Sequence, residues 1–142
     1  MENSKPCVTP MCPGYKLFVK DSEPFSDPTL YRSTIGALQY LTLTGPDLLF
    51  AINKLSQFLQ QPTLAHWSAC KRVLRYLKGT ATADLRFTPT SRFNLEGFSN
   101  ANWAFNLDDR KSTNGFLVKL GGNLITWASH KQKVVSRSST ES

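Results

Sequence analysis

Asp108 and Asp109 form the one pair of adjacent carboxylates in this chain of 142 residues. Carboxylate oxygens are the ligands that Mg²⁺ prefers, so a metal site is the first chemistry to consider. Neighbouring residues on a strand point to opposite faces, however, and this pair is followed directly by Arg110 and Lys111. We therefore interpret the two acids as part of a solvated polar turn and predict no metal site there.

The two histidines show no catalytic spacing. His66 stands beside Trp67 at the start of an expected helix, which indicates a structural or capping role. His130 follows Ser129 at the end of an expected strand and has no acid close to it in sequence. The chain contains neither a G-x-S-x-G nucleophile motif nor a glycine-rich phosphate loop. Nucleophilic catalysis is therefore not predicted.

A basic helical face is the strongest candidate for binding. Lys71, Arg75 and Lys78 are spaced at i, i+4 and i+7, so a helix places them on one face, with Arg72 beside them. An ordinary solvated face would show the same spacing, so both interpretations stay open at this point. Binding is favoured by a second basic cluster, which consists of Arg110, Lys111, Lys131, Lys133 and Arg137.

Composition agrees with a polyanionic partner. The formal net charge is +7, which favours nucleic acid, and a hydrophobic content of 40% allows a packed core. Three cysteines without metal-ligand spacing indicate reduced thiols in an intracellular setting. No apolar run approaches transmembrane length, and the first residues lack the apolar core of a signal peptide. We expect an intracellular protein that is not secreted and has no membrane partner.

Proline, glycine and capping signals divide the chain into three parts. Residues 1–27 are rich in Pro and Ser and should form an extended lead-in. Residues 28–80 should be helical, and residues 81–142 should form a sheet. The helix signals are Asp27-Pro28 as a first start, Thr44 with Asp47 three residues later as a second, Pro62-Thr63 as a third, and Gly79 as the stop.

Apolar residues between residues 28 and 80 recur at helical spacing. Three amphipathic helices joined by short connections must bury their apolar stripes against one another. The pattern therefore predicts a small three-helix bundle, with Cys70 as a core residue. The expected stripes are Tyr31, Ile35, Leu38 and Leu41; Leu48, Ile52, Leu55 and Leu59, with Ala51 and Phe58; and Trp67, Cys70, Val73, Leu74 and Leu77.

The pattern changes to short strands after Gly79. Segments 83–87, 93–98, 115–120 and 123–127 read as strands, and Gly121-Gly122 should join the last two in a tight hairpin. Ser138 and Glu141 have capping-box spacing and predict the start of a further helix. The fold class we predict is α+β, a three-helix bundle followed by an incomplete, mainly antiparallel sheet.

Five blocks of sequence keep a characteristic order along the chain. They are YRSTIGALQYL at 31–41, AINKLSQF at 51–58, KRVLRYLKGT at 71–80, FSNANWAFNLDDRKST at 98–113 and VSRSSTE at 135–141. Together they resemble the Pol polyprotein of copia-type retrotransposons, just after the polymerase palm. The resemblance implies a thumb- or connection-like helical region over 28–80 and a truncated ribonuclease H-like domain over 81–142. A match of this extent is far more specific than a single short motif.

The resemblance also implies a lost metal ligand. In this family the first nuclease carboxylate is the Asp of a motif close to Ser-Asp-Ala-Asp-Trp-Ala-Gly, and here Asn100 stands at that place. Ribonuclease H chemistry needs several carboxylates around two divalent ions, for which the family would use Mg²⁺. An Asn carbonyl brings no negative charge and should bind the ion poorly. We place the family's later carboxylates beyond Ser142, treat Glu141 as a cap, and expect no catalytic residue, metal or cofactor.

The expected function is that of a degenerate Pol fragment that is not an enzyme, because the polymerase palm would precede Met1. A thumb helix commonly follows the duplex backbone, and phosphate contacts position a duplex without reading its sequence. We therefore expect at most weak, sequence-independent binding to RNA–DNA or DNA duplexes. Two alternatives stay open: a ribonuclease H subunit that takes carboxylates from another chain, and a fragment that docks on an intact retroelement polymerase. The expected contacts are Lys71, Arg72, Arg75, Lys78, Arg110 and Lys111.

Overall fold

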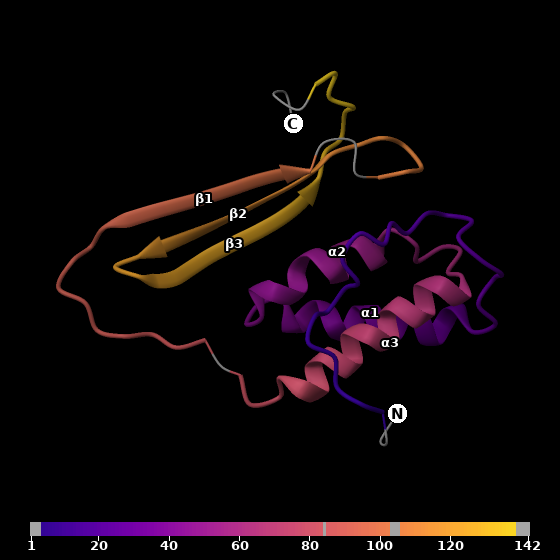
Figure 1. Ribbon diagram of the computed structural model, residues 1–142, viewed down its shortest axis with the longest axis horizontal. Helices are drawn as coiled ribbons and strands as arrows, with labels where there is room; N and C mark the ends of the chain where they lie inside the picture. The colour runs from indigo at the N-terminus through magenta and orange to yellow at the C-terminus, as the bar shows by residue number, and fades with distance from the viewer. Residues whose placement is uncertain (1–3, 84, 103–105, 139–142) are drawn as a thin grey trace. The chain divides into compact units, whose positions relative to one another are not determined.

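The structure, a computed structural model, describes residues 4–83, 85–102 and 106–138 (Figure 1). The described residues form three α-helices, one short 3₁₀ helix and a three-stranded antiparallel sheet. The predicted α+β class is therefore confirmed at this level. The chain divides into two compact units, Met1–Ala83 and Asp84–Ser142, which we call the helical unit and the sheet unit.

Helix α1, Pro28–Leu41, begins where the sequence predicts. The Asp27 carboxylate accepts a hydrogen bond from the backbone N–H of Leu30 at 2.9 Å, and Pro28 occupies the first turn, where its missing N–H costs nothing. The predicted stripe is buried at Tyr31, Ile35 and Leu38 but ends there, because Leu41 is 40% exposed.

The second helix differs from the prediction at its start. The backbone N–H of Gly45 donates to the carbonyl of Leu41 at 2.8 Å, so the chain is still completing the end of α1 at this point. Thr44 is therefore not a cap, and its hydroxyl donates back to Leu41. The helix begins instead with the 3₁₀ turn η1, Pro46–Leu48, and continues as α2, Leu49–Ser56. Asp47 accepts a hydrogen bond from the Tyr76 hydroxyl rather than completing a capping box.

Helix α3, Leu64–Gly79, is capped by Thr63 as predicted. Gly79 is the last residue of the helix rather than a left-handed stop after it. A Cβ built at Gly79 would lie 3.0 Å from Cβ of Pro6, closer than packed carbons normally approach. The lack of a side chain at Gly79 therefore allows the lead-in to pass close to the helix end.

The core of the helical unit forms between the three helices and the lead-in. Leu17 is fully buried, and Phe25 stacks on Trp67 with ring centroids 4.8 Å apart. The lead-in has no helix or named strand among its described residues, but the backbone N–H of Leu64 donates to the carbonyl of Glu23 at 2.8 Å. The lead-in thus contributes to the core. The buried apolar residues are Leu17, Tyr31, Ile35, Leu38, Leu48, Ala51, Ile52, Leu55, Phe58, Cys70 and Val73.

The sheet consists of β1, Leu95–Asn102, β2, Thr113–Leu120, and β3, Asn123–Lys131, in the order β1-β2-β3. The predicted Gly121-Gly122 hairpin is confirmed, with φ of 56° and 84° at the two glycines. Such left-handed angles are the reason glycine is favoured there. Strands β1 and β3 extend four residues beyond the predicted segments, to Asn102 and Lys131.

The strand predicted at 83–87 is wrong for the described residues of that segment. A strand needs a neighbouring strand to accept its backbone hydrogen bonds, and no strand pairs with the described residues of 83–87. The next residue, Thr88, donates its N–H to the Asn123 side chain at 2.7 Å. Of the predicted final helix start, Ser138 lies outside any helix, and 139–142 lie outside the described residues.

Candidate nucleic-acid interface

The basic face of α3 is in contact with the lead-in of the same chain. Arg75 Nε donates to the carbonyl of Lys5 at 2.7 Å, and Lys78 Nζ donates to the carbonyl of Ser4 at 3.2 Å. The predicted helical spacing is therefore present, but two of its three cations are bound to backbone carbonyl groups. Lys71 is exposed, and no described residue forms an ion pair with it.

Arg72 lies beside this face, and only some of its guanidinium N–H groups have hydrogen-bond partners among the described residues. Its Nη2 atom donates to the hydroxyl of Thr9 at 2.9 Å. Its Nε atom is buried and has no hydrogen-bond partner among the described residues. A buried donor without a partner carries a desolvation cost of about 1–3 kcal/mol. The Arg72 guanidinium therefore keeps an N–H donor that no described residue uses.

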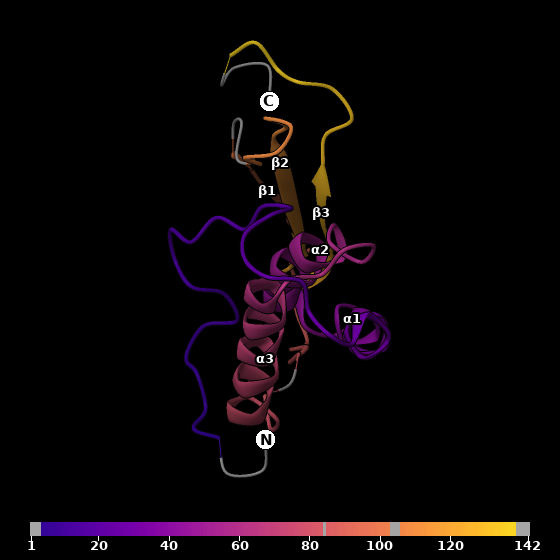
Figure 2. The same cartoon turned by 90° about the vertical axis from the view of Figure 1, so that its right-hand side faces the viewer.

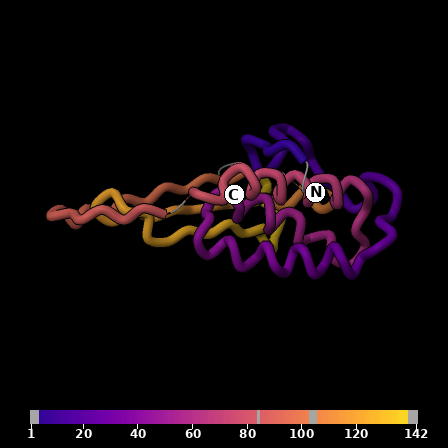
Figure 3. The backbone as a smooth tube through the Cα atoms, turned by 90° about the horizontal axis from the view of Figure 1, so that it is seen from below, coloured from indigo at the N-terminus to yellow at the C-terminus, as the bar shows by residue number. Residues whose placement is uncertain are grey.

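The backbone of the lead-in follows α3. The N–H of Cys7 donates to the carbonyl of Arg75 at 3.3 Å, and Pro6 lies against Gly79. Figures 2 and 3 show the start of the lead-in along α3 on the side away from α1. Residues 4–9 therefore cover part of the face that sequence reasoning assigned to phosphate contacts. The sequence does not predict this covering segment, because backbone carbonyls accept hydrogen bonds whatever the residue type.

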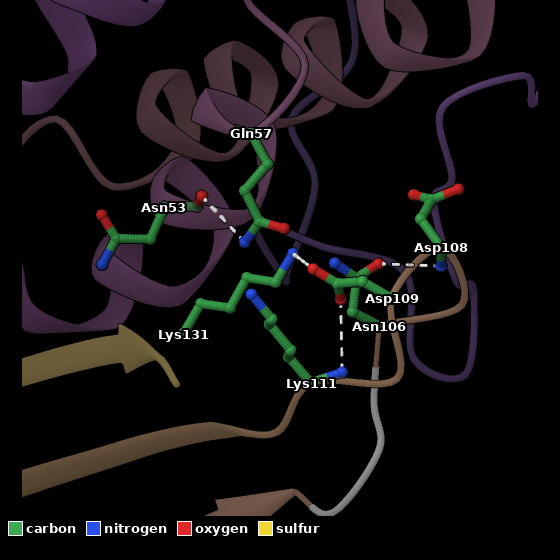
Figure 4. Close-up of polar contacts among 7 residues, drawn as sticks. All are labelled: Asn53, Gln57, Asn106, Asp108, Asp109, Lys111 and Lys131. Carbon is green, nitrogen blue, oxygen red and sulfur yellow. Dashed lines mark hydrogen bonds and ion pairs between the residues drawn. The ribbon is translucent and has the colours of Figure 1, made fainter. Parts of the chain in front are cut away.

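The second basic cluster is only partly brought together. Lys131 Nζ lies 2.7 Å from the Asp109 carboxylate, which also accepts a hydrogen bond from the backbone N–H of Lys111 at 3.2 Å (Figure 4). Burial acts to raise the pKa of Asp109, but the Lys131 hydrogen bond, the Lys111 N–H and the charges of both lysines outweigh it and lower the pKa. Lys131 is therefore largely neutralised by a local partner.

The remaining members of the second cluster lie near the surface. Arg110 has φ of 55° in the turn between β1 and β2 and is exposed. Asp108 lies in the same turn, where its N–H donates to the Asn106 side chain at 3.3 Å (Figure 4). The acid pair thus occupies a polar turn, as expected. Lys133 and Arg137 follow β3 and are exposed.

Asn100 lies near the middle of β1 among neutral residues. Its cross-strand partner is Gly115, which in turn pairs with Ser129 of β3. Paired residues share a face, so the row through Asn100 contains no carboxylate. Glu96 shares the face but is four residues away, about 13 Å along the strand. Among the described residues, no group of three or more His, Cys, Asp or Glu could hold a metal ion.

His66 is a structural residue, as predicted. Its Nδ1 atom accepts from the backbone N–H of Thr63 at 3.0 Å, while Thr63 Oγ1 accepts from the N–H of His66 at 3.4 Å. Because Nδ1 acts as an acceptor, the ring proton must be on Nε2, which donates to the carbonyl of Phe18 at 3.0 Å. The ring also stacks on Phe58. Both nitrogens are occupied by structural bonds, which leaves no free base.

The chain aligns over 99% of its length, at 48% identity, with the retrovirus-related Pol polyprotein from transposon RE2 of Arabidopsis thaliana, of which it covers 10%. It is also 43% identical, over 99% of its length, to the uncharacterized mitochondrial protein AtMg00810 of the same plant, covering 58% of that protein. The chain belongs to the copia-type retrotransposon Pol family.

A related sequence makes up most of a shorter protein with a different name. The secreted RxLR effector protein 161 of Plasmopara viticola is 48% identical over 78% of this chain, which covers 79% of the effector. No family model and no solved structure matches the chain. No helix among the described residues is both long and apolar enough to cross a membrane.

The copia-type chain spans about a tenth of the RE2 polyprotein. Asn100 and Asn102 are the residues at which the sequence predicts lost metal-ligand positions. Both lie on the same face of β1, since they are two residues apart. Two neutral amide side chains are therefore placed on one face of this strand.

Proposed function

We propose that this Pol segment is a catalytically inactive fragment that keeps weak, sequence-independent binding to nucleic-acid duplexes. The observation that carries the proposal is the basic face of α3, where Lys71, Arg72, Arg75 and Lys78 lie on one side of a capped helix. Phosphate contacts from such a face release counterions and need no base readout. Arg110 and Lys111 add positive charge in the sheet unit.

The sheet is proposed to be the opening of a ribonuclease H-like domain without its chemistry. Two-metal cleavage needs carboxylates on both ions, and the row through Asn100 contains none. We expect no cleavage of an RNA–DNA hybrid with Mg²⁺ or Mn²⁺. Asn100→Asp should stay inactive, because one carboxylate cannot hold two ions. Metal-dependent cleavage by this chain that is lost in Asn100→Ala would contradict the proposal.

A salt titration of duplex binding tests the basic face. Each phosphate contact contributes about 0.9 to the slope of log affinity against log salt for B-form DNA. The variant Lys71→Gln/Arg75→Gln/Lys78→Gln should therefore lower the slope by about two to three units. The slope is the useful quantity, because it counts phosphate contacts even where a substitution also weakens the lead-in.

A charge-matched variant controls for net charge. Lys20, Arg86 and Arg92 are exposed and lie outside both clusters, and replacing all three with Gln removes the same charge. This control should keep the wild-type slope. An equal loss of slope in both variants would show that only general positive charge matters. If binding instead requires an added intact retroelement polymerase, the fragment docks on protein rather than on nucleic acid.

A further inference from the structure

The lead-in supplies neutral oxygen atoms to the cations that the proposed function assigns to phosphate. The acceptors are the carbonyls of Ser4 and Lys5 and the hydroxyl of Thr9. Together they contact Lys78, Arg75 and Arg72 over successive turns of α3. The lead-in therefore places oxygen acceptors along a row of cations. The phosphate oxygens of a nucleic-acid strand would be hydrogen-bonded by these cations in a similar way.

We propose that residues 4–9 act as an intramolecular competitor for the basic face of α3, and that a duplex displaces them on binding. This inference rests on the proposed function. The bonds to residues 4–9 already have cationic donors, but their acceptors are neutral. An anionic phosphate adds Coulomb attraction to the same cations. Displacement of Thr9 also frees Arg72 Nη2, which donates to the Thr9 hydroxyl, for a phosphate oxygen. Exchange of neutral acceptors for phosphate therefore favours the duplex.

The attachment of residues 4–9 is suited to displacement. Leu17 and Phe25, which anchor the lead-in to the core, lie well after this segment. Residues 4–9 themselves contribute no residue to the buried apolar core, and Val8 is 92% exposed. The segment can thus leave α3 without opening the core of the helical unit.

The proposal predicts that removing the lead-in raises duplex affinity but leaves the slope of log affinity against log salt unchanged. If the lead-in leaves before or during binding, the complex has the same phosphate contacts with or without it. The apparent affinity is reduced only by the fraction of molecules in which the face is open. Deleting residues 2–9 should raise duplex affinity by about tenfold at every salt concentration, which corresponds to about ten closed molecules for each open one.

The deletion keeps the formal side-chain charge, since Glu2 and Lys5 are removed together. Circular dichroism should confirm equal helicity. Gly79→Ala is the second variant, because its Cβ would meet Cβ of Pro6 at 3.0 Å, so that Pro6 must shift by a few tenths of an ångström without any change in charge. It should raise affinity in the same direction. The deletion combined with Arg72→Gln/Arg75→Gln/Lys78→Gln should lose the gain.

Hydrogen exchange at Cys7 reports displacement directly. Its N–H is bonded to the carbonyl of Arg75, so its exchange should become faster when a duplex is added. Equal affinity of the deletion variant and the wild type, or a shallower wild-type slope, would overturn the competition while leaving duplex binding intact. Failure of both proteins to bind would overturn the proposed function together with this inference.

Discussion

The helical unit and the sheet unit differ in where their apolar side chains lie. Every fully buried apolar residue among the described residues lies between Leu17 and Val73, in the helical unit. In the sheet unit, exposed aromatic residues occur on both faces: Phe98 pairs with Leu117 on one face, and Phe116 pairs with Ser99 on the other. Helices can cover one another's apolar stripes, whereas three strands alone leave two faces uncovered.

Charge does not separate the two units. The helical unit has nine Lys and Arg against five Asp and Glu, a net charge of +4, and the sheet unit has eight against five, a net charge of +3. The difference between the units is thus one of packing and of how the charges are grouped. The buried apolar core and the best-organised basic face both belong to the helical unit.

Separating the units should give the largest effect. Residues 1–83 should unfold cooperatively on their own, because their core is complete. Residues 84–142 should aggregate or fail to fold, because exposed apolar patches and unpaired strand edges promote association. Urea unfolding followed by circular dichroism, with sedimentation for oligomeric state, measures both. A monomeric sheet fragment that unfolds cooperatively would contradict the claim that only the helical unit has a complete core.

A matched pair of isoleucines tests the same difference within the whole chain. Ile52 is fully buried in α2, and Ile125 in β3 is 46% exposed. Ile52→Ala should destabilise the helical transition by about 2–5 kcal/mol, while Ile125→Ala should cost roughly 1 kcal/mol or less. The two variants remove the same atoms, so denaturant midpoints compare the sites directly. Equal losses would mean that the sheet packs as well as the helices.

Alkaline pH should lower the free energy of unfolding of the helical unit by less than Ile52→Ala does. Burial raises the pKa of the Cys70 thiol to about 11 and raises the pKa of Tyr31 above its usual range, and the Cys70 charge adds to the Tyr31 shift. The native state therefore holds these protons more tightly than the unfolded chain. The resulting stabilisation is complete below about pH 8.5, the ordinary thiol pKa, and is lost as pH rises toward the folded values.

Denaturant midpoints between pH 8 and pH 11 measure this effect, and Cys70→Ala should flatten the Cys70 part of the decline. Alkylation at pH 8 provides a control, because exposed Cys12 should react while buried Cys70 does not. A midpoint that increases over this pH range would contradict the assignment.

Much of the helical unit could be predicted from sequence because its signals are local. Asp27-Pro28 and Thr63 cap their helices through side chains and backbone groups within three residues, so spacing alone identifies them. The cap predicted at Thr44 is wrong, because this Thr, although followed by an acid, lies inside the turn that completes α1. The Thr44 pattern alone did not show that α1 was still ending at that point.

The contacts of the lead-in could not be predicted. Lys5 and Ser4 contact α3 through backbone carbonyls, which every residue has, and the contacts join positions about 70 residues apart. The candidate site was therefore predicted as a row of cations but not as a row that its own chain covers. The segment 83–87 shows the opposite error: its residues suit a strand, but no neighbouring strand pairs with those of them that the structure describes.

Duplex binding by the isolated helical unit tests the central claim most directly, because that claim places a stable fold and the phosphate-binding face in the same 83 residues. The measurement is a salt titration of residues 1–83 and of the whole chain with one labelled RNA–DNA hybrid. The account predicts that residues 1–83 keep most of the slope of log affinity against log salt. A well-folded helical unit that shows no salt-dependent binding, while the whole chain binds, would contradict it.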